Sequence, residues 1–219
     1  MVTLTKKVKA SIPDFNLPTA LEYIGGLGAP SKMPCRSWDI PAQECKTGAK
    51  LAEIEGSICS KCYVKKGFFN IPRNQSILYK RLDAIYKPYW KYAMKVAIQQ
   101  TNETGYFRFF SAGDLQSIHH LKDIIWICEQ LPNIKAWMPT KELKIVSDYV
   151  KSGGKIPDNL TIRLSGFMID GPAPSVKGFV TSTVVRENQT CLAPSQGGKC
   201  LDCRKCWDGN VQNVSYKLH

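Results

Sequence analysis

Two groups of cysteines give this sequence its clearest potential for chemistry. The segment CLAPSQGGKCLDCRKCW, residues 191–207, contains four cysteines, three of them at strict three-residue steps: Cys191, Cys200, Cys203 and Cys206. A second group lies upstream, where Cys45 is followed by the C-x-x-C step of Cys59 and Cys62. Thiolates are ligands both of structural zinc and of iron–sulfur clusters, so both groups predict bound metal.

The spacing of the C-terminal group favours iron over zinc. Consecutive C-x-x-C steps with one more distant cysteine are typical of a [4Fe-4S] cluster, whereas structural zinc is more often held by two separated C-x-x-C pairs. We therefore expect a [4Fe-4S] cluster in this segment. Zinc and unliganded thiols remain the alternatives.

The upstream group predicts a different kind of site. Three cysteines ahead of the first long helix would leave one iron of a cubane without a protein ligand, and such an open iron is a place for chemistry. Alternatively, Cys45, Cys59 and Cys62 join a cysteine of the C-terminal group in one site that pins the tail. Cys35 is either a spare thiol or a fourth ligand that closes the first site, and Cys128 is expected to be a small buried hydrophobe.

Composition and cysteine count point to a reducing compartment. Hydrophobic residues make up 43% of 219 residues, and no apolar run approaches the roughly 18 residues that a membrane span needs. The basic stretch from Met1 to Lys7 lacks the apolar segment of a secretory signal. We expect a cytoplasmic protein, in which nine cysteines are more often metal ligands or redox groups than disulfides.

The charge is strongly positive and unevenly spread. A formal net charge of +12 favours a polyanionic partner. Residues 61–95 contain nine Lys and Arg and one acid, Asp83, and aromatic residues alternate with the basic ones. This composition suits nucleic acid or a nucleotide, because cations reach phosphates and aromatic faces stack on bases. The alternative is an amphipathic helix with its aromatics in the core and its lysines solvated.

Periodicity predicts an α/β fold. Residues 1–58 read as short strands and loops, and a helix is expected from Pro72 to about Gln100 with a kink at Pro88. Strands at 105–114, 134–140, 160–166 and 178–185 alternate with helices near 121–131 and from an N-cap at Thr140 to Gly153. Such alternation predicts a parallel sheet, either a partial (β/α) barrel or a doubly wound sheet. We expect a core over 1–186, including the cysteine loop 45–62, and a cluster-binding tail over 187–219.

The carboxyl ends of these strands carry small and polar residues. In parallel sheets ligands bind at this edge, so the strand ends together predict one binding rim. The rim candidates are Ser111, Gly113, Asp114, the segment 139–142, Arg163, Ser165, Ser182 and Thr183. His119 and His120 follow the first of these turns, where they either face the site or serve surface and capping roles.

The rim and the upstream cysteines resemble the radical S-adenosylmethionine enzymes, although the cysteine spacing departs from their usual C-x3-C-x2-C. The resemblance implies an open cluster iron that binds the amino and carboxylate groups of S-adenosylmethionine. It implies that Gly113 and Asp114, in the turn from Ser111, hold the methionine end, with Arg163 and Ser165 as candidates for the carboxylate or ribose. It further implies reductive cleavage to a radical that abstracts hydrogen from a substrate, which we expect to be a nucleotide or nucleic acid.

Over residues 30–219 the chain also resembles a family of bacteriophage proteins known by a gene-product number. The resemblance rests on the motifs AQECKTGAKLAEIEGSICSKCY, SAGDLQSIHHL, WMPTKE, LTIRLSGFMIDGP, TSTV and the C-terminal cysteine segment. It implies a viral origin, hence the host cytoplasm, and a partition of seven cysteines into an open cluster and a fully ligated one. Cys35 and Cys128 lie outside these motifs.

Two functional hypotheses follow. The first is an enzyme with one or two [4Fe-4S] clusters that binds S-adenosylmethionine. The second is a non-catalytic protein, stapled by iron–sulfur or zinc, that contacts host nucleic acid or a host protein through its basic face.

Overall fold

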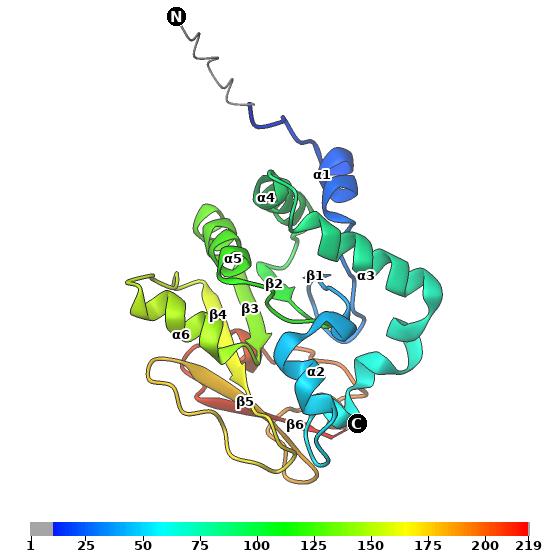
Figure 1. Ribbon diagram of the computed structural model, residues 1–219, viewed down its shortest axis with the longest axis vertical. Coiled ribbons are helices and arrows are strands. Elements are labelled where there is room, and N and C mark those ends of the chain that lie inside the picture. Colours follow the sequence, from blue (N-terminus) through cyan, green and yellow to red (C-terminus); the bar gives the residue numbers. More distant parts are fainter. Residues whose placement is uncertain (1–10, 219) are drawn as a thin grey trace, which may run out of the picture.

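A six-stranded parallel sheet forms the centre of the molecule, which we describe from a computed structural model for residues 11–218. The expectation about residues 1–7 falls outside the described part of the chain. The strands are β1 (Ser37–Trp38), β2 (Tyr106–Phe109), β3 (Lys135–Thr140), β4 (Leu160–Ser165), β5 (Val180–Val185) and β6 (Asn213–Lys217). The α/β fold and the parallel sheet are thus confirmed (Figure 1).

The strand order decides between the two expected kinds of sheet. Neighbouring strands follow chain order from β1 to β6, and every pair is parallel. A doubly wound sheet reverses its order at a switch point, where its ligands bind. No reversal occurs among the described strands, so the sheet keeps chain order from edge to edge, and the partial (β/α) barrel stays a prediction.

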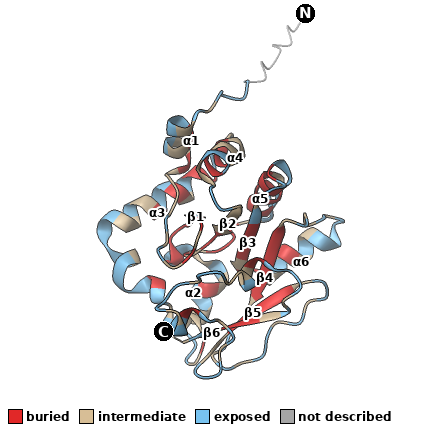
Figure 2. Ribbon diagram, turned by 180° about the vertical axis from the view of Figure 1, so that it is seen from behind, coloured by how far each residue is buried: buried red, intermediate tan, exposed pale blue. Residues whose placement is uncertain are grey.

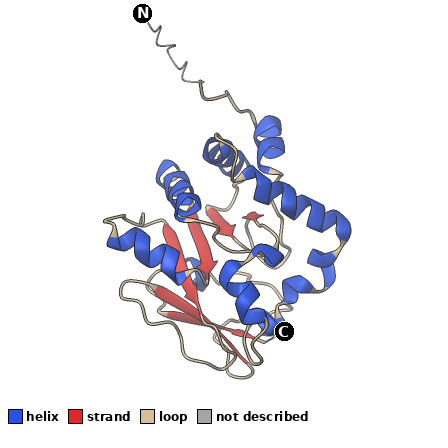
Figure 3. Cartoon of the chain, in the orientation of Figure 1, coloured by secondary structure: helices blue, strands red, loops and turns tan. Residues whose placement is uncertain are grey.

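Helices connect and cover the first four strands (Figure 3). They are α1 (Leu17–Ile24), α2 (Lys46–Ala52), α3 (Pro72–Ala84), α4 (Trp90–Thr101), α5 (Ile118–Gln130) and α6 (Leu143–Lys151). Pro72 starts α3, and the break before α4 lies at Pro88, as the sequence predicts.

Two local expectations are wrong. Within the described residues 11–58, the helices α1 and α2 stand where only strands and loops were expected; α1 begins with a capping box between Asn16 and Thr19 and ends at Gly25 with φ +76°. Thr140 is the last residue of β3 and not a helix N-cap. Its Oγ1 instead accepts a hydrogen bond from the backbone N–H of Glu142, which is the N-cap of α6.

The main core lies between the helices and one face of the sheet. Alternate strand residues such as Phe107, Met138 and Leu164 belong to one buried cluster with residues of α4 and α5. Figure 2 shows much of the central strands as buried. The intervening residues, including Arg108, Trp137 and Arg163, point to the opposite face, which we call the inner face. A second buried cluster of Met33, Cys35, Trp137 and Trp207 lies on it.

The tail completes the sheet instead of forming a separate module. Its strand β6 pairs with β5 over five registered residue pairs from Thr181–Asn213 to Val185–Lys217. The strand β6 thus lies beyond the boundary expected at residue 187 but in the same sheet as the core. No helix in the described part of the chain is long and apolar enough to cross a membrane.

Candidate functional site

Cys45, Cys59 and Cys62 form a first thiol group. Cys45 directly precedes α2, while Cys59 and Cys62 lie in and after the 3₁₀ turn Cys59–Lys61. Gly48 makes their approach possible, because a Cβ at this position would lie 2.9 Å from Cys45 Cβ and 3.5 Å from Cys59 Sγ. Cys45 and Cys62 pack together against a small buried cluster that includes Ala112.

This group is fixed to the carboxyl-terminal edge of the sheet. Glu142, just beyond β3, accepts hydrogen bonds from Thr47 N (2.8 Å) and Thr47 Oγ1 (2.9 Å) at the start of α2. Lys46 Nζ donates to the Gln116 carbonyl, 2.6 Å away, in the loop after β2. The first thiol group therefore lies at this edge, beside the ends of β2 and β3.

Burial and one lysine set the electrostatics of the first thiol group. Burial raises the pKa of Cys45, and nearby Asp114 raises it further. Burial also raises the pKa of Cys59, and the Lys141 ammonium opposes the shift at both thiols. Without metal these thiols are protonated at neutral pH. Binding of a cationic metal centre would release their protons.

Gly113 and Asp114 have structural roles at this edge. Gly113 has φ +81°, and a Cβ here would lie 2.3 Å from Ile40 Cγ1, so the turn requires glycine. Asp114 is buried and accepts hydrogen bonds from Leu115 N (2.8 Å), Thr140 Oγ1 (2.5 Å) and Lys141 N (2.8 Å). Burial raises the pKa of Asp114 to about 6, and these hydrogen bonds oppose the rise. Asp114 thus ties the end of β2 to the end of β3.

The hydroxyls of Ser111 and Ser165, at the predicted rim, make few hydrogen bonds. Ser111 Oγ is buried and has no hydrogen-bond partner among the described residues, although the Ser111 N–H donates to Asp39. Ser165 Oγ lies 3.3 Å from Ser182 Oγ across neighbouring strands. Both hydroxyls therefore retain capacity to bind a ligand.

Arg163 is not a rim residue. Its side chain is fully buried on the inner face and donates five hydrogen bonds, all to carbonyl oxygens: Cys206 (3.0 Å), Thr181 (3.1 Å), Val211 (2.9 Å), Lys205 (2.6 Å) and Asp208 (2.8 Å). A guanidinium has five N–H donors, so none is left for a carboxylate or ribose. Arg163 was expected to bind the carboxylate or ribose of a ligand. Its side chain instead holds the tail against β4.

A second thiol group lies on the inner face, and it includes Cys35. The Cys200 N–H donates to the Lys32 carbonyl (2.9 Å), which brings the tail to the loop before β1. Cys35 packs in the same buried cluster as Cys200 and Cys206. The electrostatic neighbours of these thiols also include Cys191 and Cys203. Cys35 therefore does not close the first thiol group but joins the second.

In the second thiol group, burial raises the pKa of Cys35 and Cys206, and an arginine lowers it. Burial raises the pKa of Cys35 to about 12, and the Arg108 guanidinium acts against this rise. Burial raises the pKa of Cys206 to about 11, opposed by a hydrogen bond with Tyr216 and by Arg108. Cys206 Sγ lies 3.2 Å from Tyr216 Oη.

Arg108 lies between the two thiol groups. Its guanidinium stacks on Trp137 at 4.1 Å from the ring centroid and donates to the Phe110 carbonyl (3.1 Å). It also lowers the pKa of Tyr63, which burial raises, and Tyr63 directly follows Cys62. The sequence analysis did not single out Arg108. Its place in β2, three residues before Ser111 and on the inner face by alternation, is the signal that was present.

The two thiol groups are separate from each other. Cys45 and Cys59 have as thiol neighbours only members of the first group, and the same holds within the second group. These neighbours favour two groups over the alternative in which the upstream cysteines and a tail cysteine form one site. Within residues 11–218, no three His, Cys, Asp or Glu side chains stand ready to hold a single metal ion. In a cubane, each thiolate binds a different iron, which spaces the sulfurs more widely than around one ion.

The comparison with protein families decides the affiliation. The sequence profile described as gene product 88 matches residues 4–176. The chain belongs to the gene product 88 family. This confirms the phage gene-product resemblance in its coarser form, but the match ends before Cys191, so the C-terminal cysteine segment is not what carries it. Comparison with curated proteins and with solved structures gives no match.

The remaining candidates of this gene product 88 member lie away from the rim. His120 is buried among Trp38, Trp90 and Phe110, and burial lowers its pKa to about 3. His119 is exposed, with Nε2 3.5 Å from an Asp123 oxygen. Neither faces the first thiol group. Cys128 is buried in the main core, as predicted.

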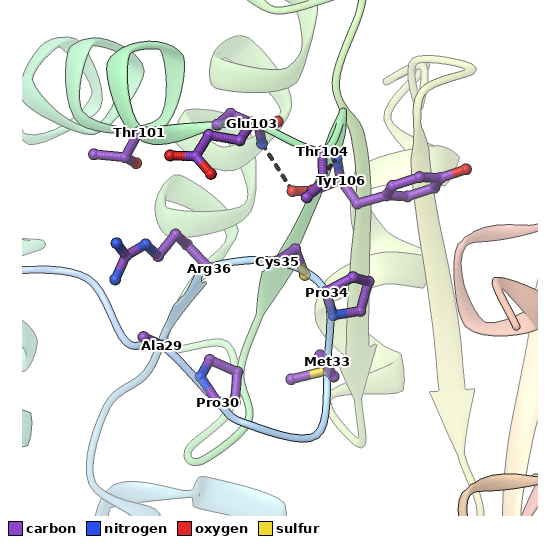
Figure 4. Close-up of a pocket in the computed structure, with 11 residues that line it drawn as sticks. Ala29, Pro30, Met33, Pro34, Cys35, Arg36, Thr101, Glu103, Thr104 and Tyr106 are labelled. Carbon is purple, nitrogen blue, oxygen red and sulfur yellow. Dashed lines mark hydrogen bonds between the residues drawn. The ribbon is translucent and has the colours of Figure 1, made fainter. Parts of the chain in front are cut away.

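An open recess of about 200 Å³ lies at the other edge of the sheet, where β1 and β2 begin (Figure 4). Cys35, Arg36 and Tyr106 contribute to its lining. The Asn102 side chain there is already used by its own loop, donating to the Tyr106 carbonyl (2.8 Å) and accepting from Gly105 N (2.7 Å). The recess therefore lies apart from the rim and its thiols.

Proposed function

We propose that this protein is an iron–sulfur enzyme that binds S-adenosylmethionine at its first thiol group. The observation that carries the proposal is the convergence of Cys45, Cys59 and Cys62 on the carboxyl-terminal rim of a parallel sheet, apart from every tail thiol. Three thiols satisfy three irons of a cubane and leave the fourth for a ligand. A bound cluster of this kind supplies the electron for reductive cleavage of S-adenosylmethionine.

The residues of the rim fit this proposal with changed roles. Lys141 is a cation that acts on both Cys45 and Cys59, so it is suited to an anionic cluster and to the carboxylate of the cofactor. Ser111 and Ser165 offer hydroxyls for polar groups of the same ligand. Gly113 and Asp114 act indirectly, by holding the turn and joining β2 to β3, and Arg163 takes no part in ligand binding.

The second thiol group is proposed to hold another [4Fe-4S] cluster on the inner face. The second thiol group contains five cysteines, and a fully ligated [4Fe-4S] cluster requires four thiolate ligands. Arg108 and Arg163 place positive charge beside them, which favours thiolate ligands. In this scheme the second cluster holds the tail against the sheet or relays electrons, with Arg108 and Tyr63 lying between the two groups.

The experiment is metal analysis of protein purified without oxygen. We expect about eight irons and as many sulfides per chain, as two cubanes require. Electron paramagnetic resonance of the reduced protein should change when S-adenosylmethionine is added, since the ligand would bind an iron directly. In Cys62→Ala the iron should fall by about half and the response to S-adenosylmethionine should disappear.

Cys128→Ala is the matched control, because Cys128 belongs to neither thiol group and its loss should leave iron and spectrum unchanged. A full complement of iron in Cys62→Ala, or a spectrum indifferent to S-adenosylmethionine, would count against the open cluster. Zinc without iron would favour the second candidate, a metal-stapled protein that binds through its basic face without catalysis. The exposed basic residues between Lys61 and Lys87 are the observation that favours this alternative.

A further inference from the structure

The outer surface from Lys61 to Lys87 carries an unusual set of exposed side chains. It consists of the short 3₁₀ turns between residues 59 and 70, helix α3 and the residues up to 87 (Figure 1). Its exposed basic residues are Lys61, Lys65, Lys66, Arg73, Lys80 and Lys87, and its exposed aromatic residues are Phe68, Tyr79 and Tyr86. We call this set the basic–aromatic surface.

The structure divides the basic stretch of the sequence into two parts. In the second part, α4 buries Trp90 in the main core, and Lys91 is held 3.3 Å from Asp123 and over the ring of Trp126. That part is therefore closer to an ordinary amphipathic helix, whose aromatic residues pack in the core, than to a binding surface. In the first part the aromatics reach solvent: Phe68 is 71% exposed and Tyr86 is 73% exposed.

Helix α3 presents its charge on one side. Leu78, Arg81 and Ala84 are buried, and Arg81 is used internally, with Nη1 3.7 Å from an Asp39 oxygen. Arg73 and Lys80 lie seven residues apart on the opposite, exposed side. Figure 2 shows this outward side of α3 as mostly exposed. Asp83 is the exposed acid among residues 61–87, so the surface is strongly positive.

We propose that the basic–aromatic surface binds single-stranded nucleic acid. Lys and Arg side chains bind phosphates regardless of sequence, whereas exposed aromatic rings stack on bases, which only an unpaired strand offers freely. An acidic protein partner would use the charge but gives no reason for solvent-exposed Phe68 and Tyr86 beside it. The combination of both side-chain types therefore favours a single strand over a duplex or a protein.

The surface also leads to the first thiol group. Lys61 adjoins Cys62 in the chain, and Lys65 is among the charges that lower the pKa of Cys59. A strand bound along α3 and the turns would thus end beside the rim. The inference rests on the proposed function only in making this strand the substrate; binding itself requires no cluster.

The test is fluorescence anisotropy of the full chain with a labelled deoxythymidine oligomer of about 20 nucleotides, compared with a duplex of the same length. We expect tighter binding of the single strand. In Phe68→Ala, and separately in Tyr86→Ala, the Kd should rise about 5- to 150-fold, the range corresponding to loss of one stacked base.

Charge is tested by changing Lys65, Lys66 and Arg73 together to Gln. The slope of log Kd against log salt should fall by about 2, because each lost phosphate contact on a single strand contributes about 0.7. The matched control changes Lys135, Lys155 and Lys177 to Gln, which removes the same charge from exposed positions elsewhere. It should leave most of the affinity and the slope intact.

Several outcomes would overturn the inference. Equal weakening by the two triple variants would show that net charge alone drives binding, and equal or tighter binding of the duplex would reject the single strand. Unchanged affinity in both aromatic variants would remove stacking from the account. Because the altered side chains are exposed, each variant should melt like the parent, and iron analysis of the same samples keeps a failure of binding distinct from a failure of the cluster proposal.

Discussion

Replacing Arg163 by Met should release the tail from the sheet. The substitution keeps an apolar side chain of similar reach but removes all five hydrogen bonds to the carbonyls of residues 181–211. Four of those five carbonyls belong to the tail segment 205–211 that crosses the inner face. They would be left without this partner in a buried site.

The magnitude follows from the nature of these bonds. A hydrogen bond to a charged group contributes about 1.5–3 kcal/mol, but five cannot be added at full value because the freed carbonyls turn toward water and toward one another. We expect a loss of about 3–5 kcal/mol in the free energy of unfolding, as when one partner of a buried charged network is removed. Against a typical total of about 5–15 kcal/mol, this is severe.

The assay is urea unfolding with a chelator present, so that bound metal does not contribute, combined with hydrogen exchange of the β6 amides. Arg163→Lys keeps the charge and up to three donors and should fall between the parent and Arg163→Met. Arg36→Met, at an exposed position, is the control. If Arg163→Met unfolds like the parent and its β6 amides stay protected, the reasoning about this fastening is refuted.

Three further predictions concern single positions. Gly113→Ala should destabilise the protein by more than about 1 kcal/mol in urea unfolding, since φ is +81° and a Cβ has no room, whereas Gly209→Ala, with no atom near its Cβ position, should change little. His120 stays neutral when folded and gains a proton when unfolded, so below pH 6.5 the free energy of unfolding of the parent should fall relative to that of His120→Asn by about 1.4 kcal/mol per pH unit, in unfolding measured from pH 7 to pH 5. The comparison with the variant is needed because the raised pKa of Asp114 contributes a dependence of opposite sign below pH 6. Cys35→Ala should leave the bound iron unchanged, because Cys191, Cys200, Cys203 and Cys206 remain to hold the second cluster, and Cys128→Ala should leave it unchanged as well.

Each of these has a contrary result. Equal stability of the two glycine variants would show that the turn at Gly113 tolerates a side chain. Parallel pH profiles for the parent and His120→Asn would mean that another group governs the acid limb. Loss of about half of the iron in Cys35→Ala would instead make Cys35 a required ligand of the second cluster.

Periodicity and strand-end chemistry were enough to predict most of the sheet and its rim. The strands and helices between residues 72 and 185 follow patterns of period 2 and 3.6 that burial imposes locally. Helix α1 was missed because its Pro and Gly neighbours suggested loops, although Pro18 and Gly25 are its start and end signals. β6 was missed because NVSYK is short and polar, and only pairing with β5 makes it a strand.

The long-range partners could not be read from the chain. Cys35 meets Cys200 because a tail hydrogen bond to Lys32 brings them together, and nothing near Cys35 in the sequence encodes that contact. Arg163 was placed at the rim by its nearness to a strand end. Its actual role depends on alternation, which points it to the inner face, and on a segment more than forty residues later that fills this face.

The path of the tail has a consequence for the chirality of the chain. The connections β2–α5–β3 and β3–α6–β4 pass over the helical face of the sheet, whereas residues 186–212, which join β5 to its neighbour β6, cross the inner face. Since the strands continue in the same order, this last crossover has the opposite hand to the others. Left-handed crossovers between parallel strands are rare, because strand twist feeds a helix back onto the sheet from the other side. Here the segment contains no α-helix, so that constraint is relaxed, and the reversed hand is what delivers the tail thiols to the interior of the fold.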